Sequence, residues 1–151
     1  MLLICKSSNL AKLIMGCVVV FLGAFQVNGH EQNFKSLVIY HPYLIKENKK
    51  EALGFLSVEN TSSKSEYLIK IISQFSSGYR LWRRVDDDEF VEINLSSGVE
   101  IRSGEAIYID QDEFKLLFWG VDESMDWYDK HVAIFVFRDA GAIELDFEVE
   151  Q

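Results

Sequence analysis

The sequence is poor in the residues that most often carry chemistry or cross-link a small domain. Its 151 residues include 2 cysteines, 1 proline, 3 histidines and 3 methionines. Both cysteines, Cys5 and Cys17, precede residue 30, as do Met1 and Met15. From residue 30 onward the chain therefore has no cysteine, which excludes disulfides, thiol nucleophiles and thiolate metal sites from that part.

The first 29 residues have the pattern of an export signal. Lys6 and Lys12 form a short positive region, an apolar core runs from Leu13 to Phe25, and Val27 to Gly29 offer a cleavage site. The apolar run is shorter than the roughly 20 residues that a membrane span needs. The sequence thus predicts a signal peptide followed by one periplasmic or secreted domain, residues 30–151, with no membrane span.

The exported part is strongly acidic. The whole chain has 15 Lys and Arg against 24 Asp and Glu, and two of the basic residues, Lys6 and Lys12, belong to the predicted signal peptide. The remaining 13 basic residues face 24 acids, a formal charge of −11. Such a surface repels phosphate backbones and no basic stripe offsets it, so we expect no nucleic-acid partner.

Short segments of strand type fill the exported part. The alternation is clearest at the end of the chain, where Ile143, Leu145, Phe147 and Val149 alternate with acids. The predicted strands span residues 36–41, 53–60, 66–73, 79–85, 90–95, 98–102, 105–110, 114–121, 131–138 and 142–150. An isolated strand pair is barely stable in water, so these strands must stack with their apolar faces inward. This predicts an all-β Greek-key β-sandwich.

Helix is scarce in this pattern. The best candidate is "DESMDWYDK", residues 122–130, in which Asp122 could cap a turn. The segment is so short that a loop satisfies it equally well, and both possibilities stay open.

No residue pattern points to catalysis. The acidic run 86–89 lacks the glycine and the alternating oxygen ligands of a calcium loop, which indicates a solvated hairpin tip. His41 and His131 each lie at a strand end without a second histidine at ligand spacing, which favours structural or surface roles. There is no nucleophile elbow, and both "SSG" sequences read as turns rather than phosphate loops. We therefore expect no enzyme and no catalytic residues.

Several stretches, taken in order, resemble a known family. They are "LVIYHPYLIKE", "EALGFLSVENTSSKSEYLIKIIS", "VEIRSGEAIYIDQDEFKLLFWGV" and "FRDAGAIELDFEVE". Together they are similar to the periplasmic copper chaperones of the PCu(A)C type from Leu37 to Glu150. The resemblance implies a cupredoxin-like β-sandwich that binds copper in the bacterial envelope and helps to deliver it toward a terminal oxidase.

The family's copper ligands are replaced in this sequence. The resemblance places its first histidine on Trp82, its methionine on Ile93, and its His-x-Met pair on Lys115 and Leu117. Cuprous copper prefers thioether and imidazole donors, which none of these side chains provides. Met125 is the only methionine after residue 30, so no His-x-Met pair exists elsewhere in the exported part.

Two functional interpretations follow from the resemblance. In the first, the chain is a binding or interaction module for an unknown protein or peptide, without a cofactor. Its apolar patch would comprise Trp82, Ile93, Leu117 and Trp119, with Lys115 at the rim. Simple packing of these side chains over the end of the sandwich remains open.

The alternative retains copper. His30 would become the first residue after signal removal, and its amine and ring can chelate copper. Together with His41 and His131 it would form a relocated weak site in a copper chaperone that serves a respiratory oxidase.

Overall fold

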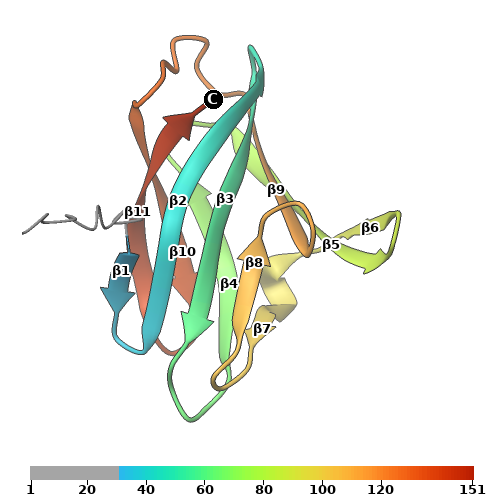
Figure 1. Cartoon of the computed structure of the whole chain (residues 1–151), viewed down its shortest axis with the longest axis vertical. Coiled ribbons are helices and arrows are strands. Elements are labelled where there is room, and N and C mark those ends of the chain that lie inside the picture. Colours follow the sequence, from blue (N-terminus) through green and yellow to red (C-terminus); the bar gives the residue numbers. More distant parts are fainter. Residues whose placement is uncertain (1–30) are drawn as a thin grey trace, which may run out of the picture.

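The computed structural model describes residues 31–151, and the predicted signal peptide lies outside them. These residues form an almost entirely β structure (Figure 1). The strands are β1 (Glu31–Phe34), β2 (Leu37–Asn48), β3 (Glu51–Asn60), β4 (Glu66–Ser73), β5 (Gly78–Asp86), β6 (Glu89–Glu92), β7 (Val99–Ile101), β8 (Ala106–Ile109), β9 (Phe114–Trp119), β10 (Lys130–Phe137) and β11 (Gly141–Glu150). A short 3-10 helix, η1 (Leu95–Ser97), lies between β6 and β7. Within this part of the chain, no helix has the length and hydrophobicity that crossing a membrane requires.

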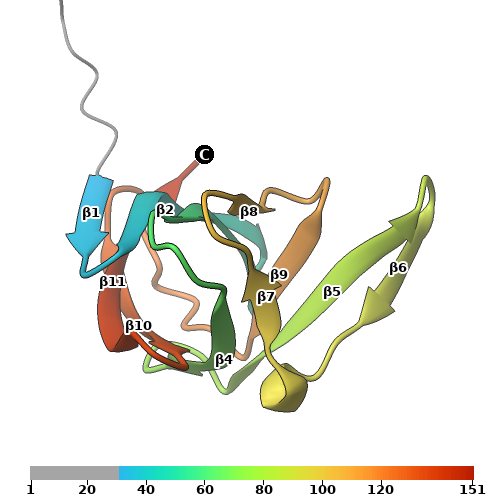
Figure 2. The ribbon, with the colours of Figure 1, turned by 90° about the horizontal axis from the view of Figure 1, so that it is seen from below.

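All of these strands belong to one hydrogen-bonded sheet, which curls until its two halves face each other (Figure 2). The order along the sheet is β6-β5-β9-β8-β3-β2-β11-β10-β4-β7, and β1 pairs with β2. Neighbouring strands are antiparallel except for β2 with β11 and β8 with β9. The predicted all-β sandwich is confirmed, and the pairing of β2 with β11 joins its two layers.

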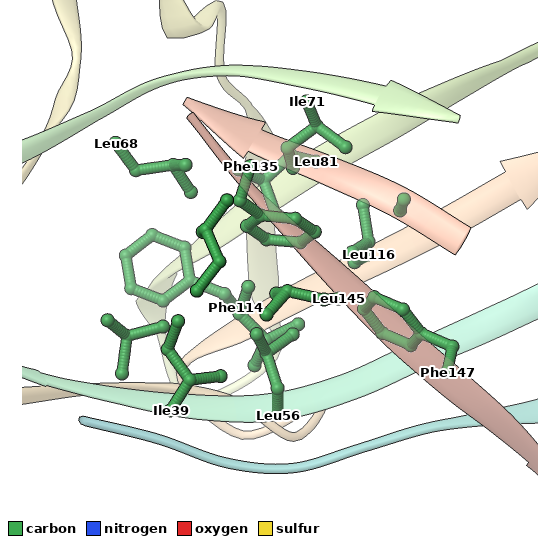
Figure 3. Packing of buried hydrophobic residues seen from close by; sticks show 14 of the residues in the cluster. Ile39, Leu56, Leu68, Ile71, Leu81, Phe114, Leu116, Phe135, Leu145 and Phe147 are labelled. Carbon is green, nitrogen blue, oxygen red and sulfur yellow. The ribbon is translucent and has the colours of Figure 1, made fainter. Parts of the chain in front are cut away.

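The core lies between the two layers (Figure 3). Phe135 of β10 and Phe147 of β11 stack with their ring centroids 5.9 Å apart. Phe118 of β9 approaches β3 so closely that a Cβ added to Gly54 would lie 2.8 Å from its ring. Full burial of one such side chain stabilises the fold by roughly 1.5–3 kcal/mol, so the inward alternation of apolar residues determines which face of each strand turns inward.

Strand β2 is longer than the sequence predicts. The predicted strand ended at His41, but β2 continues through Pro42 to Asn48. A β-bulge shifts its register with β3 between Tyr40 and Tyr43, and His41 within the bulge has a φ of 46°. Before the bulge β2 borders β1, and after it β2 borders β11. Pro42 falls between these two ladders, where its missing N–H removes no ladder bond.

The structure adds one strand that the sequence did not predict, and it decides between the helix and the loop considered for residues 122–130. Strand β1 is a short, mostly exposed polar segment that has no apolar alternation to reveal it, and it pairs with β2. Of residues 122–130, for which the sequence allowed a helix or a loop, residues 122–129 form a loop and Lys130 begins β10. The side-chain Oδ1 of Asp122 accepts a hydrogen bond from the Ser124 amide at 2.9 Å, and Met125 is buried in the core. The loop is thus anchored by one apolar side chain.

The hairpin formed by β5 and β6 projects away from the rest of the sheet (Figures 1 and 2). Its turn consists of Asp87 and Asp88, and the acidic run 86–89 is exposed. The run is therefore a solvated hairpin tip, as its sequence indicates.

A buried carboxylate joins two distant parts of the chain. Glu66, at the start of β4, is almost fully buried. Its side chain accepts hydrogen bonds from the backbone amides of Asp139 at 3.0 Å and Ala140 at 2.7 Å, and from Tyr67 at 2.8 Å. Because buried polar groups require partners, this carboxylate fixes the turn between β10 and β11 against β4.

Candidate interaction site on the outer face of β9

Strand β9 presents two different faces because its side chains alternate. The inner residues, all buried, are Phe114, Leu116 and Phe118. The outer residues, half-buried or exposed, are Lys115, Leu117 and Trp119. Three of the four positions that the family resemblance singled out, Trp82, Lys115 and Leu117, therefore lie on the outer face of β9 and its neighbour β5.

Trp82 of β5 lies directly across from Lys115 in the antiparallel ladder. The Nζ atom of Lys115 is 6.0 Å from the centroid of the Trp82 ring, at the outer limit of a cation–π contact. Both side chains are half-buried. The aliphatic stem of Lys115 can therefore cover apolar surface while its ammonium group stays in water.

Leu117 lies between Arg80 of β5 and Leu53 of β3 in the sheet register. Leu53 also points outward, because the adjacent Gly54 faces the ring of Phe118 on the core side. It is nevertheless only 3% exposed. Outer-face side chains therefore cover Leu53, and the outer surface here has a small apolar layer of its own.

Trp119 completes this surface. It is 43% exposed and pairs with Gly78 of β5. A Cβ added at Gly78 would lie 2.7 Å from the indole of Trp119, so the absence of a side chain at Gly78 is what lets the ring lie flat against β5. Leu53, Trp82, Lys115, Leu117 and Trp119 together are called the β9 outer patch below.

Ile93 does not join this patch. Its amide donates to the carbonyl of Leu81 at 2.8 Å, which places it opposite a core residue of β5. Its side chain packs against the core and lines a cavity of about 410 Å³ beside Val99 and Phe114. The residue of β6 that lies across from Trp82 is Glu92. The structure therefore gathers Trp82, Lys115 and Leu117 on one face and places Ile93 on the other.

The sequence did not identify Leu53 as part of this patch, nor Glu92 as its neighbour. Leu53 belongs to the patch through the register of β3 with β9, and Glu92 borders it through the register of β6 with β5. The signal that could have found Glu92 is strand parity. In a two-stranded hairpin, residues that face each other share a side, and the residue next in sequence faces the other way.

The histidines occupy separate places. His41 lies in the bulge of β2, with its Nε2 3.0 Å from a carboxylate oxygen of Glu150. His131 lies in β10 beside the ring of Phe75, and its Nε2 has no hydrogen-bond partner among the protein atoms. Burial lowers the pKa of His131, and the carboxylates of Asp129 and Asp122 act in the opposite direction.

Across residues 31–151, no three His, Cys, Asp or Glu side chains gather in an arrangement that could hold a metal ion. His30, the remaining member of the relocated site considered above, lies outside the described residues.

The curled sandwich has the fold of a known class of domain, the PCuAC domain. No protein-family model matches the sequence, and no curated protein matches it. Among solved structures, the copper-bound PCuAC domain from PmoF2 matches with a TM-score of 0.66 at 17% identity, over 80% of this chain and 97% of that domain.

Two metal-free structures give the same result. The apo PCuAC domain from PmoF2 has a TM-score of 0.66 at 15% identity, over 80% of this chain and 94% of that one. The apo PCuAC domain from PmoF1 has a TM-score of 0.67 at 14% identity, over 80% of this chain and 98% of that one. The cupredoxin-like fold expected from the sequence resemblance is confirmed, and at these identities the likeness concerns the fold.

Proposed function

We propose that this chain is an exported PCuAC-type domain that has lost the usual histidine and methionine copper site and acts as a protein- or peptide-binding module in the bacterial envelope. The observation that carries the proposal is the β9 outer patch. Two tryptophans and a leucine occupy a surface that includes three of the four positions to which the family resemblance assigns copper ligands.

The side chains present do not fit copper. Cuprous copper binds thioether sulfur and imidazole nitrogen. The indole of Trp82 and the alkyl chain of Leu117 offer no ordinary ligand atom, and the ammonium group of Lys115 repels a cation. Ile93, the fourth position, is an alkyl side chain that packs on the core side. No copper chemistry is therefore assigned to this surface.

The same side chains suit a binding surface. Partly exposed aromatic residues are enriched where proteins bind one another, because a rigid ring buries much area at little cost in conformational entropy. Trp119 is 43% exposed and Trp82 is half-buried, with Leu117 between β5 and β3. A partner that covered both rings would remove apolar surface from water, which supports binding of an apolar segment.

Export is part of the proposal. The predicted signal peptide over residues 1–29, the absence of cysteine after it, and the acidic balance of the remaining chain are consistent with a periplasmic or secreted domain. Release of a mature protein that starts near His30, detected by mass spectrometry of the periplasmic fraction, is the expected result.

A charge placed in the β9 outer patch tests the binding module. Trp82→Glu should abolish recovery of crosslinked partners from envelope extracts, because a carboxylate there must be desolvated on binding. Val91→Glu is the matched control, since Val91 is 45% exposed on the opposite face of the same hairpin. Both variants should keep a cooperative urea transition. Equal recovery by Trp82→Glu and the wild type would contradict the proposal.

A copper titration separates this proposal from a relocated copper site. Residues 30–151, titrated with Cu(I) against a chromophoric competitor, should show no stoichiometric site of submicromolar affinity. His41 and His131 lie on different strands, and among residues 31–151 they form no metal-holding group with the acids. A tight site that disappears in His41→Gln or His131→Gln would overturn the proposal in favour of the copper chaperone.

Restored ligands test where the family's metal site would lie on this fold. The combination Trp82→His, Glu92→Met, Lys115→His and Leu117→Met places four soft donors on one face, since Trp82 faces both Lys115 and Glu92. We expect this variant to bind Cu(I). The matched control, Ile93→Met in place of Glu92→Met, should bind more weakly because Ile93 packs on the other face.

A further inference from the structure

A second surface lies on the outer face of β2, β3 and β8, which run side by side in Figure 1. Three tyrosines, Tyr40, Tyr43 and Tyr108, line a groove of about 190 Å³ together with Phe55 and Asp110. Trp82, Lys115 and Leu117 do not line it. This tyrosine groove is therefore separate from the proposed binding patch on β9.

The β-bulge of β2 creates the groove. In a regular strand Tyr40 and Tyr43 would point to opposite faces, because their positions differ by an odd number. The extra residue at His41–Pro42 shifts the alternation, so that Leu44 faces the core while Tyr40 and Tyr43 both face outward. The positive φ of His41 is part of this bulge, whose strain is sustained by the surrounding ladders.

The pairing of β2 with β3 and of β3 with β8 determines which residues line the tyrosine groove. Tyr40 pairs with Ser57, and Ser57 pairs with Tyr108. A small side chain thus separates two tyrosines, of which Tyr108 is 51% exposed. Tyr43 stacks on Phe55 with their ring centroids 4.6 Å apart, and this stack forms one end of the groove. The result is an aromatic slot open to solvent.

The slot is surrounded by carboxylates. The hydroxyl of Tyr40 donates to Glu59 at 3.0 Å, and this hydrogen bond is the main cause of a raised pKa of Tyr40. Burial raises the pKa of Tyr43, and the charges of Glu150 and Asp110 add to the effect. No lysine or arginine lines the groove. Negative charge around aromatic faces favours a cation.

An acidic cleft continues the groove toward the β5–β6 hairpin. The two surfaces share Tyr108 and Asp110. The cleft, of about 560 Å³, is lined further by Arg84, Val85, Asp86, Asp87, Asp112 and Glu113. Its single cation, Arg84, is already engaged by Asp112 at 3.3 Å and by the carbonyl of Asp87 at 3.1 Å. Asp86, Asp110 and Glu113 accept hydrogen bonds from backbone amides, but within residues 31–151 none of them, nor Asp87, forms an ion pair, so their negative charge is not neutralised by a cation.

We propose that the tyrosine groove and the acidic cleft together bind a basic, extended segment of a partner protein, with one Arg or Lys side chain between Tyr40 and Tyr108 and a second along the cleft. The complementarity of charge carries this choice of partner: aromatic faces and carboxylates recognise a guanidinium or ammonium group, and the only side chain of the groove that contacts one of these carboxylates as a base is His41, which lies against Glu150. This inference goes beyond the proposed function and does not depend on the β9 outer patch.

Peptide binding tests the inference directly. The probe is a fluorescently labelled peptide that carries two arginines two residues apart, so that both point the same way in an extended chain. Residues 30–151 should bind it, and binding should weaken as salt rises from about 50 mM to about 300 mM. The same peptide with citrulline in place of arginine keeps the shape without the charge and should not bind.

Variants locate the site. Tyr108→Ala should weaken binding by about fivefold through loss of a cation–π contact, and Asp110→Asn by a similar factor through loss of charge while keeping the acceptor for the amides of Asp112 and Glu113. Tyr128→Ala is the matched control, because Tyr128 is a tyrosine in the 122–129 loop that is 61% exposed, somewhat more than Tyr108. Its affinity should equal that of the wild type.

Three results would overturn the inference. They are no binding of the arginine peptide, equal binding of the citrulline peptide, and unchanged affinity of a folded Tyr108→Ala variant. Arginine amide that binds as tightly as the peptide would also overturn it, because the site would then recognise a small cation rather than a protein segment. Because Trp82→Glu leaves the groove intact, failure here is distinguishable from failure of the β9 outer patch.

Discussion

The two faces of β9 contrast sharply although they alternate along six residues. On the inner face, Phe114, Leu116 and Phe118 are packed between the layers, where each ring or branch touches neighbours from distant strands. On the outer face, Lys115, Leu117 and Trp119 are half-buried or exposed, and their neighbours in the sheet are residues of β5 and β3. The inner face is constrained by packing on all sides, whereas the outer face borders solvent. The difference teaches that substitutions on the outer face should disturb the fold less than substitutions on the inner face.

The largest expected effect is on stability, and it concerns the buried inner face of β9. Phe118 is fully buried. The centroid of its ring lies 4.8 Å from the ring centroid of Phe75 and 6.0 Å from that of Phe147. We expect Phe118→Ala to lower the free energy of unfolding by about 3–5 kcal/mol, since it leaves a cavity among unmoved neighbours. Urea denaturation followed by circular dichroism measures this value.

The neighbouring outer residue is the matched control. Leu117→Ala should lower the free energy of unfolding by only about 1 kcal/mol, because its side chain is half-buried and no closed cavity remains. Equal losses at Phe118 and Leu117 would show that the outer face is as constrained as the core, and the contrast would fail.

A smaller effect is expected at the buried carboxylate on the core side of β4. Glu66→Ala removes the acceptor for the amides of Asp139 and Ala140 and leaves them buried, so we expect a loss of about 2–3 kcal/mol in unfolding free energy. Glu66→Gln retains one acceptor oxygen and should lose less. Hydrogen exchange at Ala140 should accelerate in Glu66→Ala, and unchanged protection would count against this role.

The smallest effect is a dependence on pH at His131. Burial lowers the pKa of His131 below its ordinary value of 6.5, so the unfolded chain binds a proton there more readily than the folded chain does. Stability contributed by the neutral ring is therefore present above pH 6.5 and is lost as the pH falls toward the lowered pKa. His131→Gln removes this contribution.

Urea midpoints at about pH 7.5 and about pH 5 check it. The wild type should lose more stability between the two values than His131→Gln does. Asp129 and Asp122 face the ring and attract the proton, so a larger loss in the variant would show that their charges outweigh burial.

Much of the fold follows from the pattern of residues. The predicted strand 66–73 has the bounds of β4, and the predicted strand 142–150 differs from β11 by one residue. Strand β11 has a strict alternation that only one orientation in the sandwich satisfies, whereas β4 changes register where it pairs with the end of β10. The segment around Pro42 was predicted less well. A proline normally ends a strand, and only the change of neighbour from β1 to β11 makes its missing donor harmless.

The site was predictable in part for the same reason. The family resemblance pointed to Trp82, Lys115 and Leu117, which the ladder of β5 with β9 brings to one face. It also selected Ile93, whose orientation depends on the register of a hairpin that residue counting does not reveal. The tyrosine groove escaped notice because Tyr40 and Tyr108 are far apart in sequence and meet across Ser57 of β3.

The amino-acid sequence by itself determined the inventory: after residue 29 there is no cysteine and one methionine, and acids outnumber basic residues. It also determined that the strands must bury one face, since alternation with a period of two admits little else. Only the tertiary structure decided which outward residues meet. Register, bulges and the change of strand neighbours place side chains in contact across the sheet, and these depend on pairing between segments that are distant in the chain.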